Sequence, residues 1–343
     1  MRFWDFHPSA PAPRAAEGAL GGRGGDGFAL RAPAQQHEVP GFGLFHDFIA
    51  TPSWFIVLAA PATWGPGGWK SLAMTLEWIR GERPVTSMID FDRAKPTVAH
   101  FFPRGGGGGG GVGGGGVVSV PLDTFFSFHH ANAFEPDPRR PSLVTFDTVR
   151  ADELKVDDSS LVTDDRDDDS ADGGGGGGGR GRAPPDTAAT GTAADAALRG
   201  EGNRFILEDI DYARDVPRVT LMRYEVDLEH GSFTQRVLSP RHVEFPSVAP
   251  AVRGRPHRYV YSSPGPAADG VSPQSGVLKT DTADAARSQI WLPPPHQFCG
   301  EVLFTPRRKC GEEEDAAGGE RGGGGGADDE DDGYLLTLCF DGA

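Results

Sequence analysis

Short apolar runs recur along the chain, separated by polar and glycine-rich stretches. Residues 54–60 (WFIVLAA) are continuously apolar and are followed by a proline, which is typical of a buried strand. Two further runs, 219–228 and 232–238, are joined by a short EHG turn and predict a β-hairpin. The recurrence of such runs predicts an all-β fold, namely a sandwich, a barrel or a propeller. The other strand candidates are residues 86–91, 98–102, 117–122, 125–130, 143–149, 258–262, 276–281, 302–305 and 334–340.

One segment changes period and predicts a helix. Trp69, Leu72, Leu76 and Ile79 fall at helical spacing with polar residues between them, so they form the apolar face of a short amphipathic helix. Two interpretations stay open for this face. It can pack on its own domain, or, together with Trp64, it can contact a membrane surface.

Four low-complexity stretches interrupt the strand candidates, at residues 12–36, 105–116, 157–199 and 311–329. They are rich in Gly, Asp, Glu or Ala, and we expect them to be loops inserted into a single domain that spans residues 1–343. The first glycine tract is not a phosphate-binding loop, because no Lys-Ser/Thr pair and no helix pattern follow it.

Composition narrows the function. The 343 residues contain 33 Lys and Arg against 49 Asp and Glu, which gives a formal net charge of −16 and argues against a nucleic-acid partner. The three cysteines, Cys299, Cys310 and Cys339, follow no zinc or disulfide spacing, so we expect free thiols in a reducing compartment. A serine nucleophile is not indicated, since no G-x-S-x-G sequence occurs.

Two histidine positions stand in unusual surroundings. His46 lies in the apolar stretch GFGLFHDFIATPSWF, and His129 with His130 lies in FFSFHHANAFE. Burying an imidazole among Phe side chains is unfavourable unless each ring nitrogen has a partner, and a metal with a carboxylate would satisfy both nitrogens. Glu244, which lies between Val and Phe-Pro, is a carboxylate expected to be half buried. A satisfied core histidine is the simpler alternative, because no H-x-H or H-E-x-x-H spacing is present.

Five stretches resemble, in order, the signature blocks of the carotenoid cleavage oxygenases, the family that includes carotenoid dioxygenases and the isomerohydrolase of the retinal pigment epithelium. The resemblance implies a seven-bladed β-propeller with a non-haem iron(II), Fe(2+), on its axis, held by four histidines. The stretches are PGFGLFHDFIATPSWFIV, FSFHHANAFE, EFPSVAPAVRGRPHRYVYS, GEVLFTPR and EDDGYLLTLCFD.

The resemblance also implies roles for individual residues. His46 matches the second iron ligand and His129 the third, whereas His130 points elsewhere. Glu244 matches a carboxylate that orients His129, and Glu330 matches the one that orients the fourth histidine. Such outer carboxylates fix the tautomer and raise the basicity of a ligating imidazole. The first and fourth ligands have no matching block, so the resemblance implies a propeller that is incomplete at both ends and inactive by itself.

The implied reaction is oxidative cleavage of a carbon–carbon double bond in a carotenoid or apocarotenoid by O2, giving carbonyl products. Because such substrates dissolve in membranes, the resemblance favours peripheral membrane contact through residues 64–79. It also implies a plastid location, with the cytoplasm as the alternative. Two other functions compete: a catalytically inactive propeller that binds apocarotenoids or a protein partner, and an unrelated propeller hydrolase with a different metal.

Overall fold

The computed structural model of the chain divides into two compact units. The first comprises Met1–Thr63, Phe91–Leu154 and Val216–Ala343, and the second comprises Trp64–Asp90 and Lys155–Asp215. The low-complexity stretches 157–199 and 311–329 lie outside the described residues, as does nearly all of 105–116. The structure describes residues 2–3, 6–8, 28–30, 35–36, 38–39, 45–65, 68–80, 89–104, 116–154, 212, 216–307 and 330–342.

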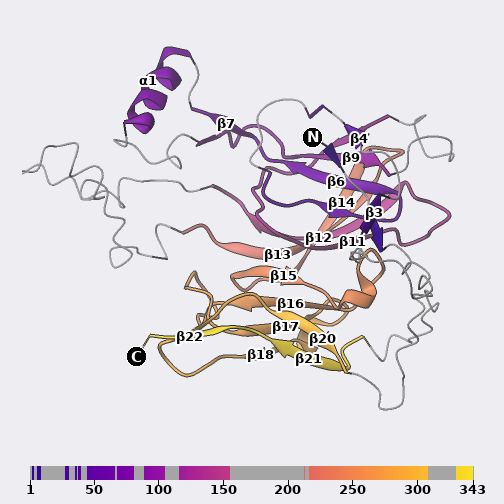
Figure 1. The fold of residues 1–343 in the computed structure, drawn as a ribbon, viewed down its shortest axis with the longest axis vertical. Coiled ribbons are helices and arrows are strands. Elements are labelled where there is room, and N and C mark those ends of the chain that lie inside the picture. Colours follow the sequence, from indigo (N-terminus) through magenta and orange to yellow (C-terminus); the bar gives the residue numbers. More distant parts are fainter. Residues whose placement is uncertain are drawn as a thin grey trace, which may run out of the picture. The chain divides into compact units, whose positions relative to one another are not determined.

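Three four-stranded antiparallel sheets dominate the first unit (Figure 1). In each sheet the strand that comes first in the sequence lies at one edge, with orders β10-β9-β6-β5, β11-β12-β13-β14 and β15-β16-β17-β18. The strands are β5 (Ile49–Ala50), β6 (Trp54–Ala59), β9 (Val98–Pro103), β10 (Val118–Pro121), β11 (His130–Phe134), β12 (Leu143–Ala151), β13 (Val219–Asp227), β14 (Ser232–Ser239), β15 (Val243–Ser247), β16 (Tyr259–Pro264), β17 (Val277–Asp281) and β18 (Gln289–Trp291).

The remaining strands form two-stranded antiparallel pairs. The pairs are β1 (Arg2–Phe3) with β4 (Gln35–Gln36), β2 (Phe6–Pro8) with β3 (Phe28–Leu30), β7 (Ala62–Trp64) with β8 (Ile89–Phe91), β19 (Gln297–Cys299) with β22 (Cys339–Asp341), and β20 (Leu303–Pro306) with β21 (Gly333–Leu336). Two short 3-10 helices, η4 (Pro250–Val252) and η5 (Ala285–Arg287), lie in the third sheet's connections.

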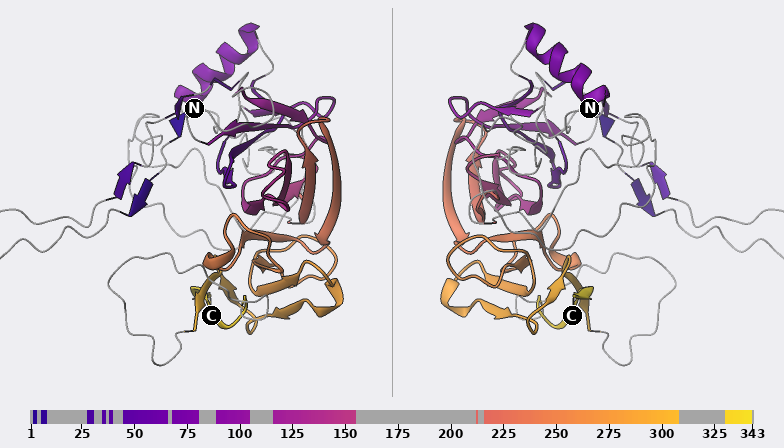
Figure 2. Two further views of the ribbon diagram at one scale, coloured as in Figure 1. Left: turned by 90° about the vertical axis from the view of Figure 1, so that its right-hand side faces the viewer. Right: turned by 90° about the vertical axis from the view of Figure 1, so that its left-hand side faces the viewer.

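The three sheets follow one another in sequence order in Figures 1 and 2, from indigo and purple through magenta to orange. Their first strands are neighbours, since β5 contacts β11 and β11 contacts β15. Four-stranded antiparallel sheets that place their first strands side by side are the arrangement of propeller blades. The prediction of an all-β, propeller-type fold is confirmed.

Aromatic side chains hold the first and second sheets together. Tyr224 is fully buried and stacks on Phe125 at 5.3 Å and on Phe146 at 5.1 Å between ring centroids. Ile56 and Phe101, from β6 and β9, belong to the same core cluster. Each such side chain contributes roughly 1.5–3 kcal/mol by leaving water, so the continuous apolar runs that predict strands also supply the core.

Most predicted strands are confirmed within one to three residues, and three predictions are wrong. Of the predicted strand 86–91, residues 86–88 lie outside the described residues. Residues 125–130 do not form a strand but carry an isolated bridge between Phe126 and Ala151 before β11 begins. Residues 334–340 break into β21 and β22, because residues 337–338 leave the ladder. The stretch 12–36 is not wholly a loop, since it contains β3 and β4, whose short polar surroundings gave no strand pattern.

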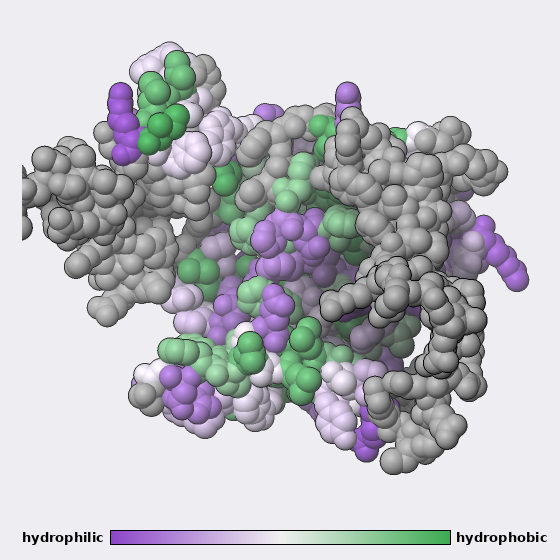
Figure 3. Space-filling model, viewed as in Figure 1, coloured by the Kyte–Doolittle hydropathy of each residue, from purple (hydrophilic) through white to green (hydrophobic). Residues whose placement is uncertain are grey.

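The predicted helix is α1 (Gly68–Ile79) of the second unit. Trp64 anchors it, because its ring meets the Trp78 ring at 6.0 Å and its indole N–H donates to Thr75 Oγ1 at 3.4 Å. The predicted apolar face is exposed, and Figure 3 shows hydrophobic side chains on the helix surface. Its exposed fractions are 75% for Trp69, 63% for Leu72, 43% for Leu76 and 68% for Ile79. Among the described residues no helix is long and apolar enough to cross a membrane.

Candidate metal centre

His129 lies directly before β11, at the edge of the second sheet that faces the third. Its Nδ1 is 2.8 Å from Oε2 of Glu244, which comes from β15 at the near edge of the third sheet. One quarter of the His129 side chain is exposed, whereas Glu244 is buried. The predicted pairing of this histidine with this carboxylate is therefore present in the geometry.

A β-bulge in β15 turns Glu244 toward His129. The register runs from Glu244 opposite Ser263 to Ser247 opposite Tyr261, so one extra residue is inserted. Pro246 cannot donate to the ladder, and Phe245 adopts a left-handed φ of 54°. Bulges redirect side chains beside functional sites, and the Glu-Phe-Pro sequence encodes this one.

The Phe245 backbone and ring both serve the same site. Its N–H donates to Oε2 of Glu244 at 3.1 Å, and its ring lies 5.0 Å from the His129 ring. The carboxylate therefore accepts from a backbone amide and faces an imidazole at once. A residue held at positive φ without being glycine is strained, and such strain persists where surrounding contacts maintain it.

His46 lies beside His129. The two ring centroids are 5.0 Å apart and the ring planes are inclined by 80°. Asp47 holds the His46 segment next to the His129 segment, because its Oδ2 accepts the backbone N–H of His130 at 3.2 Å. His46 itself is exposed and touches Phe128 at 5.6 Å between ring centroids. The structure thus brings together two histidines that lie far apart in the sequence.

The electrostatics of His129 follow from this setting. The hydrogen bond to Glu244 raises the pKa of His129 against the opposing effect of burial, and the charges of Asp47 and Glu301 add to the increase. When His129 is neutral and donates from Nδ1 to Glu244, its Nε2 carries the lone pair. A histidine that binds a metal through Nε2 needs this tautomer, and a carboxylate on the other ring nitrogen fixes it.

His130 is held away from this pair. Its Nδ1 lies 2.7 Å from Thr148 Oγ1, and burial lowers its pKa to about 4. Its hydrogen bond to a hydroxyl and its preference for the neutral form are those of a satisfied core histidine. Its exclusion from the ligand set stays a prediction.

Glu330 has a different setting from Glu244. Its carboxylate accepts backbone N–H groups from Arg258, at 2.9 and 3.0 Å, and from Tyr259, at 2.8 Å. It therefore clamps the start of β16, and its expected role beside a fourth histidine stays a prediction. Glu301, two residues after the end of β19, is the carboxylate from that part of the chain whose charge acts on His129. Sequence reasoning missed Glu301 and Asp47, although both lie inside the quoted blocks.

A buried network stabilises the strand that follows His129. Arg223 donates to both carboxylate oxygens of Asp147, at 2.7 and 2.8 Å, and His257 Nε2 lies 2.8 Å from Asp147 Oδ2. Asn132 of β11 meets His257 Nδ1 at 3.0 Å and accepts the Gly254 N–H at 2.8 Å. These bonds tie the second sheet to the segment before β16.

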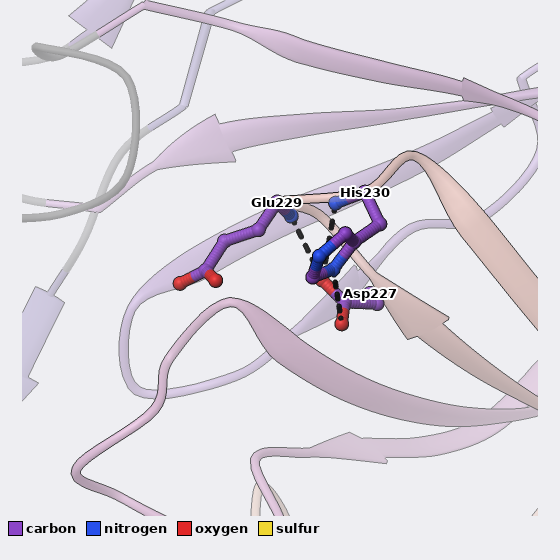
Figure 4. A group of neighbouring side chains, drawn as sticks. All are labelled: Asp227, Glu229 and His230. Carbon is purple, nitrogen blue, oxygen red and sulfur yellow. Dashed lines mark hydrogen bonds and ion pairs between the residues drawn. The ribbon is translucent and has the colours of Figure 1, made fainter.

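One other group of potential metal ligands occurs among the described residues, in the turn between β13 and β14 (Figure 4). Asp227 Oδ1 accepts the N–H groups of Glu229 and His230, at 2.9 and 3.2 Å, and Asp227 Oδ2 lies 2.9 Å from His230 Nδ1. The Asp227 carboxylate accepts hydrogen bonds from the turn itself, so these three residues stabilise the hairpin and we assign no metal site to them.

Comparisons with known proteins agree with the family resemblance of the sequence blocks. A family model described as "Retinal pigment epithelial membrane protein" matches residues 16–343. The apocarotenoid-15,15'-oxygenase of Synechocystis sp. (strain ATCC 27184 / PCC 6803 / Kazusa) is 25% identical over 268 residues, which is 78% of this chain and 41% of that protein.

Solved structures share the fold. Cobalt-substituted Synechocystis ACO matches with a TM-score of 0.60 and 24% identity, over 92% of this chain and 48% of that one. An ACO/RPE65 chimera matches with a TM-score of 0.61 and 23% identity, over 92% of this chain and 48% of that one. The chain therefore spans about half the length of the solved relatives and less of the curated one.

Proposed function

Because the chain belongs to the retinal pigment epithelial membrane protein family of carotenoid oxygenases, we propose that it contributes to an iron-dependent oxygenase that cleaves a double bond of a carotenoid or apocarotenoid. The apocarotenoid substrate comes from the name of the Synechocystis relative. The observation that carries the proposal is the juxtaposition of His46 and His129 with Glu244 on the second ring.

The donor set fits a metal of the first transition series. Two neutral imidazoles are ligands that iron(II) accepts, and the Glu244 carboxylate gives His129 the required tautomer. Among the described residues the pair offers two ligands and no third convergent group, so other ligands of the proposed centre come from elsewhere. Iron(II), when bound, would supply the activation of O2.

The residues of this chain have three tasks in the proposal. Glu244 holds the His129 ring and its Nδ1 proton, while Asp47 keeps His46 beside it through the His130 amide. Phe128 and Phe245 border the two imidazoles and give the centre an apolar rim. Such a rim suits a polyene, which binds by burying apolar surface and has no polar group along its conjugated chain.

The test starts from the native protein, recovered by antibody from its own source. Its intact mass comes first, because a mass above that of these 343 residues would identify further chain able to supply ligands. Iron content and the two carbonyl products of an apocarotenal are then measured. We expect His46→Ala and His129→Ala to lose iron and cleavage, and His230→Ala, in an exposed turn, to retain both.

Two outcomes would contradict the proposal. Unchanged iron content in both histidine variants would refute the ligand assignment. A native protein that binds apocarotenals without iron or products would instead be the inactive binding propeller.

The membrane contact of the helix belongs to the same proposal. A carotenoid oxygenase must take its substrate from a lipid phase, and α1 exposes two Trp and three aliphatic side chains within twelve residues. We therefore propose that this face lies in the headgroup region of a membrane. A plastid location follows from the same substrate class, and a fluorescent fusion of the native protein distinguishes it from the cytoplasm.

A further inference from the structure

Two cysteines face each other across one pair of strands. Cys299 ends β19 and Cys339 begins β22, and the antiparallel register sets the first opposite the second. Their Sγ atoms are 3.0 Å apart although 40 positions separate them in the sequence. Sequence spacing gave no sign of this contact.

The backbone hydrogen bonds around the pair make a disulfide geometrically possible. Gly300 N donates to Leu338 O, and Gly342 N donates to His296 O, each at 2.9 Å. Cys299 and Cys339 therefore form a pair without backbone hydrogen bonds between them, the narrow type in which Cα atoms are about 4.5 Å apart. Disulfides need Cα separations of about 4.4–6.8 Å, so both strands can keep their positions.

The two thiols differ in access. Cys339 is exposed, whereas Cys299 is 4% exposed. Burial, with the contact to Cys339, raises the pKa of Cys299 to about 12. An external oxidant therefore reaches Cys339 first, and Cys299 is the partner that completes the reaction from inside.

We propose that Cys299 and Cys339 form a reversible cross-strand disulfide by exchange with a small-molecule disulfide such as oxidised glutathione. The Cys339 thiolate attacks one glutathione sulfur, a mixed disulfide forms, and one glutathione thiolate leaves. The Cys299 sulfur then loses its proton and attacks Cys339 Sγ, which releases the second glutathione. The two protein thiols lose two electrons and two protons, and one glutathione disulfide becomes two thiols.

The bond would secure a segment that already reaches the third sheet. Between the two cysteines, Glu330 binds the backbone amides of Arg258 and Tyr259, and Val302 O accepts the Ser247 hydroxyl at 2.9 Å. A disulfide between the two ends of this segment would lower the conformational entropy of the unfolded chain and so stabilise the folded state. The inference is independent of the proposed function, because it uses neither the metal nor the substrate.

Thiol labelling tests the proposal on the native protein. The protein is equilibrated with oxidised or reduced glutathione, unfolded in urea with N-ethylmaleimide present so that buried free thiols are labelled too, digested without reduction and analysed by mass spectrometry. We expect oxidised glutathione to lower labelling of Cys299 and Cys339 together by at least about tenfold and to yield one cross-linked peptide pair. Cys310→Ser should give the same cross-link, and reduced glutathione should restore labelling.

Three results would overturn the proposal: full labelling of both cysteines in oxidised glutathione, a stable glutathione adduct on Cys339 alone, or a cross-link that uses Cys310. Cys339→Ser should abolish the cross-link and leave Cys299 unreactive toward oxidised glutathione, so that it is labelled in full once the protein is unfolded. Because the decisive labelling uses the unsubstituted protein, the test holds even if a serine at the buried position 299 impairs folding.

Discussion

At the scale of single residues, one hydrogen bond decides what His129 can bind. Either ring nitrogen of a neutral histidine can carry the proton, and a metal needs the other one free. Glu244 lies 2.8 Å from Nδ1 and so directs the lone pair to Nε2. In the proposed centre the carboxylate would act on the metal only through the imidazole, which makes it a positioning residue.

Replacing this carboxylate should weaken metal binding without removing a ligand. Glu244→Gln keeps an acceptor of similar shape but loses the charge, so we expect the native protein's affinity for iron(II) to fall by roughly 10- to 100-fold. Competition with a chelator of known affinity measures it. Glu229→Gln, in the exposed turn after β13, is the matched control and should leave affinity unchanged. Equal affinities in both variants would remove Glu244 from the site.

Asp147 is the residue on which acid stability depends. Burial opposes its ionisation, but hydrogen bonds from Arg223 and His257 outweigh this, so its pKa lies below 3.8. A lowered folded-state pKa adds stability above the unfolded pKa, and this stability is lost as pH falls through the folded value. Asp147→Asn should cost about 3–5 kcal/mol at pH 7, because Arg223 is left buried without a counter-charge.

Urea unfolding at several pH values checks this prediction. The difference between wild type and Asp147→Asn should be largest near neutral pH and shrink below about pH 4. A difference that stays constant down to pH 2 would show that the aspartate contributes no charge-dependent stability. Asp284→Asn, exposed beside η5, is the control and should change little.

The candidate site was predictable in part at this scale. Apolar surroundings singled out His46, His129 and Glu244, because each polar group in them needs a partner. Asp47 and Glu301 could not be assigned, since their effect depends on which backbone amide or ring they reach in space. Glu330 shows the converse, because a motif position alone does not reveal that backbone amides occupy its carboxylate.

At the scale of elements, the bulge in β15 is the feature that builds the site. Phe245 takes a φ of 54° inside the bulge. This conformation lets the preceding Glu244 side chain face His129. Asn tolerates this conformation, whereas a β-branched residue does not. Backbone conformation is thus as much part of the site as the side chains.

A pair of substitutions at position 245 separates backbone from ring. Phe245→Asn and Phe245→Val both remove the ring that faces His129, but only Val opposes the positive φ. We expect the Val variant to be less stable than the Asn variant by about 1–2 kcal/mol in urea unfolding. It should also bind iron(II) more weakly. Equal stability would mean that the bulge does not depend on this residue's conformation.

The exposed face of α1 carries a second prediction at this scale. Trp69→Ser with Ile79→Ser should lower binding to neutral phosphatidylcholine vesicles by at least about fivefold, because apolar area provides the binding free energy. Flotation of the native protein measures it. Lys70→Ser, which leaves the apolar face intact, is the control. Equal binding by all three proteins would exclude the helix as the membrane contact.

Elements with strong periodicity were predictable, whereas those shaped by tertiary contacts were not. The sequences of β6 and of the β13–β14 hairpin show the apolar runs of strands, and that of α1 shows the spacing of an amphipathic helix. The Phe-rich residues 125–130 resemble a strand, yet Phe125 and Phe126 are buried in the core and only one bridge forms. β15 was missed because its proline and bulge interrupt the alternation that marks a strand.

At the scale of the whole molecule, the site is assembled from three sheets of the first unit. His46 precedes β5, His129 precedes β11, and Glu244 lies in β15, and these strands form neighbouring edges. His129 meets His46, 83 positions before it, and Glu244, 115 positions after it, because each sheet begins at the same edge. The order of motifs in the sequence is therefore the order of sheets in space.

Metal removal should lower the stability of those edge strands first. A bound ion at a hundred times its Kd adds about 2.7 kcal/mol to the stability of the folded state. Hydrogen exchange of the native protein, with and without a chelator, should show faster exchange in β5, β11 and β15. The central strands β6 and β12 are the internal control, and uniform changes in all five would contradict the assignment.

The meeting of three edges at one pair of imidazoles has a further consequence, for how the protein would be damaged. A substitution that shifts one sheet by an ångström need not unfold anything, since each sheet keeps its own ladder of hydrogen bonds. It would nevertheless separate His46 from His129, whose rings belong to different sheets. The site is thus more fragile than the fold that carries it. Variants that remain soluble and β-structured can still have lost the chemistry, and a correct circular dichroism spectrum is no guarantee of a competent centre.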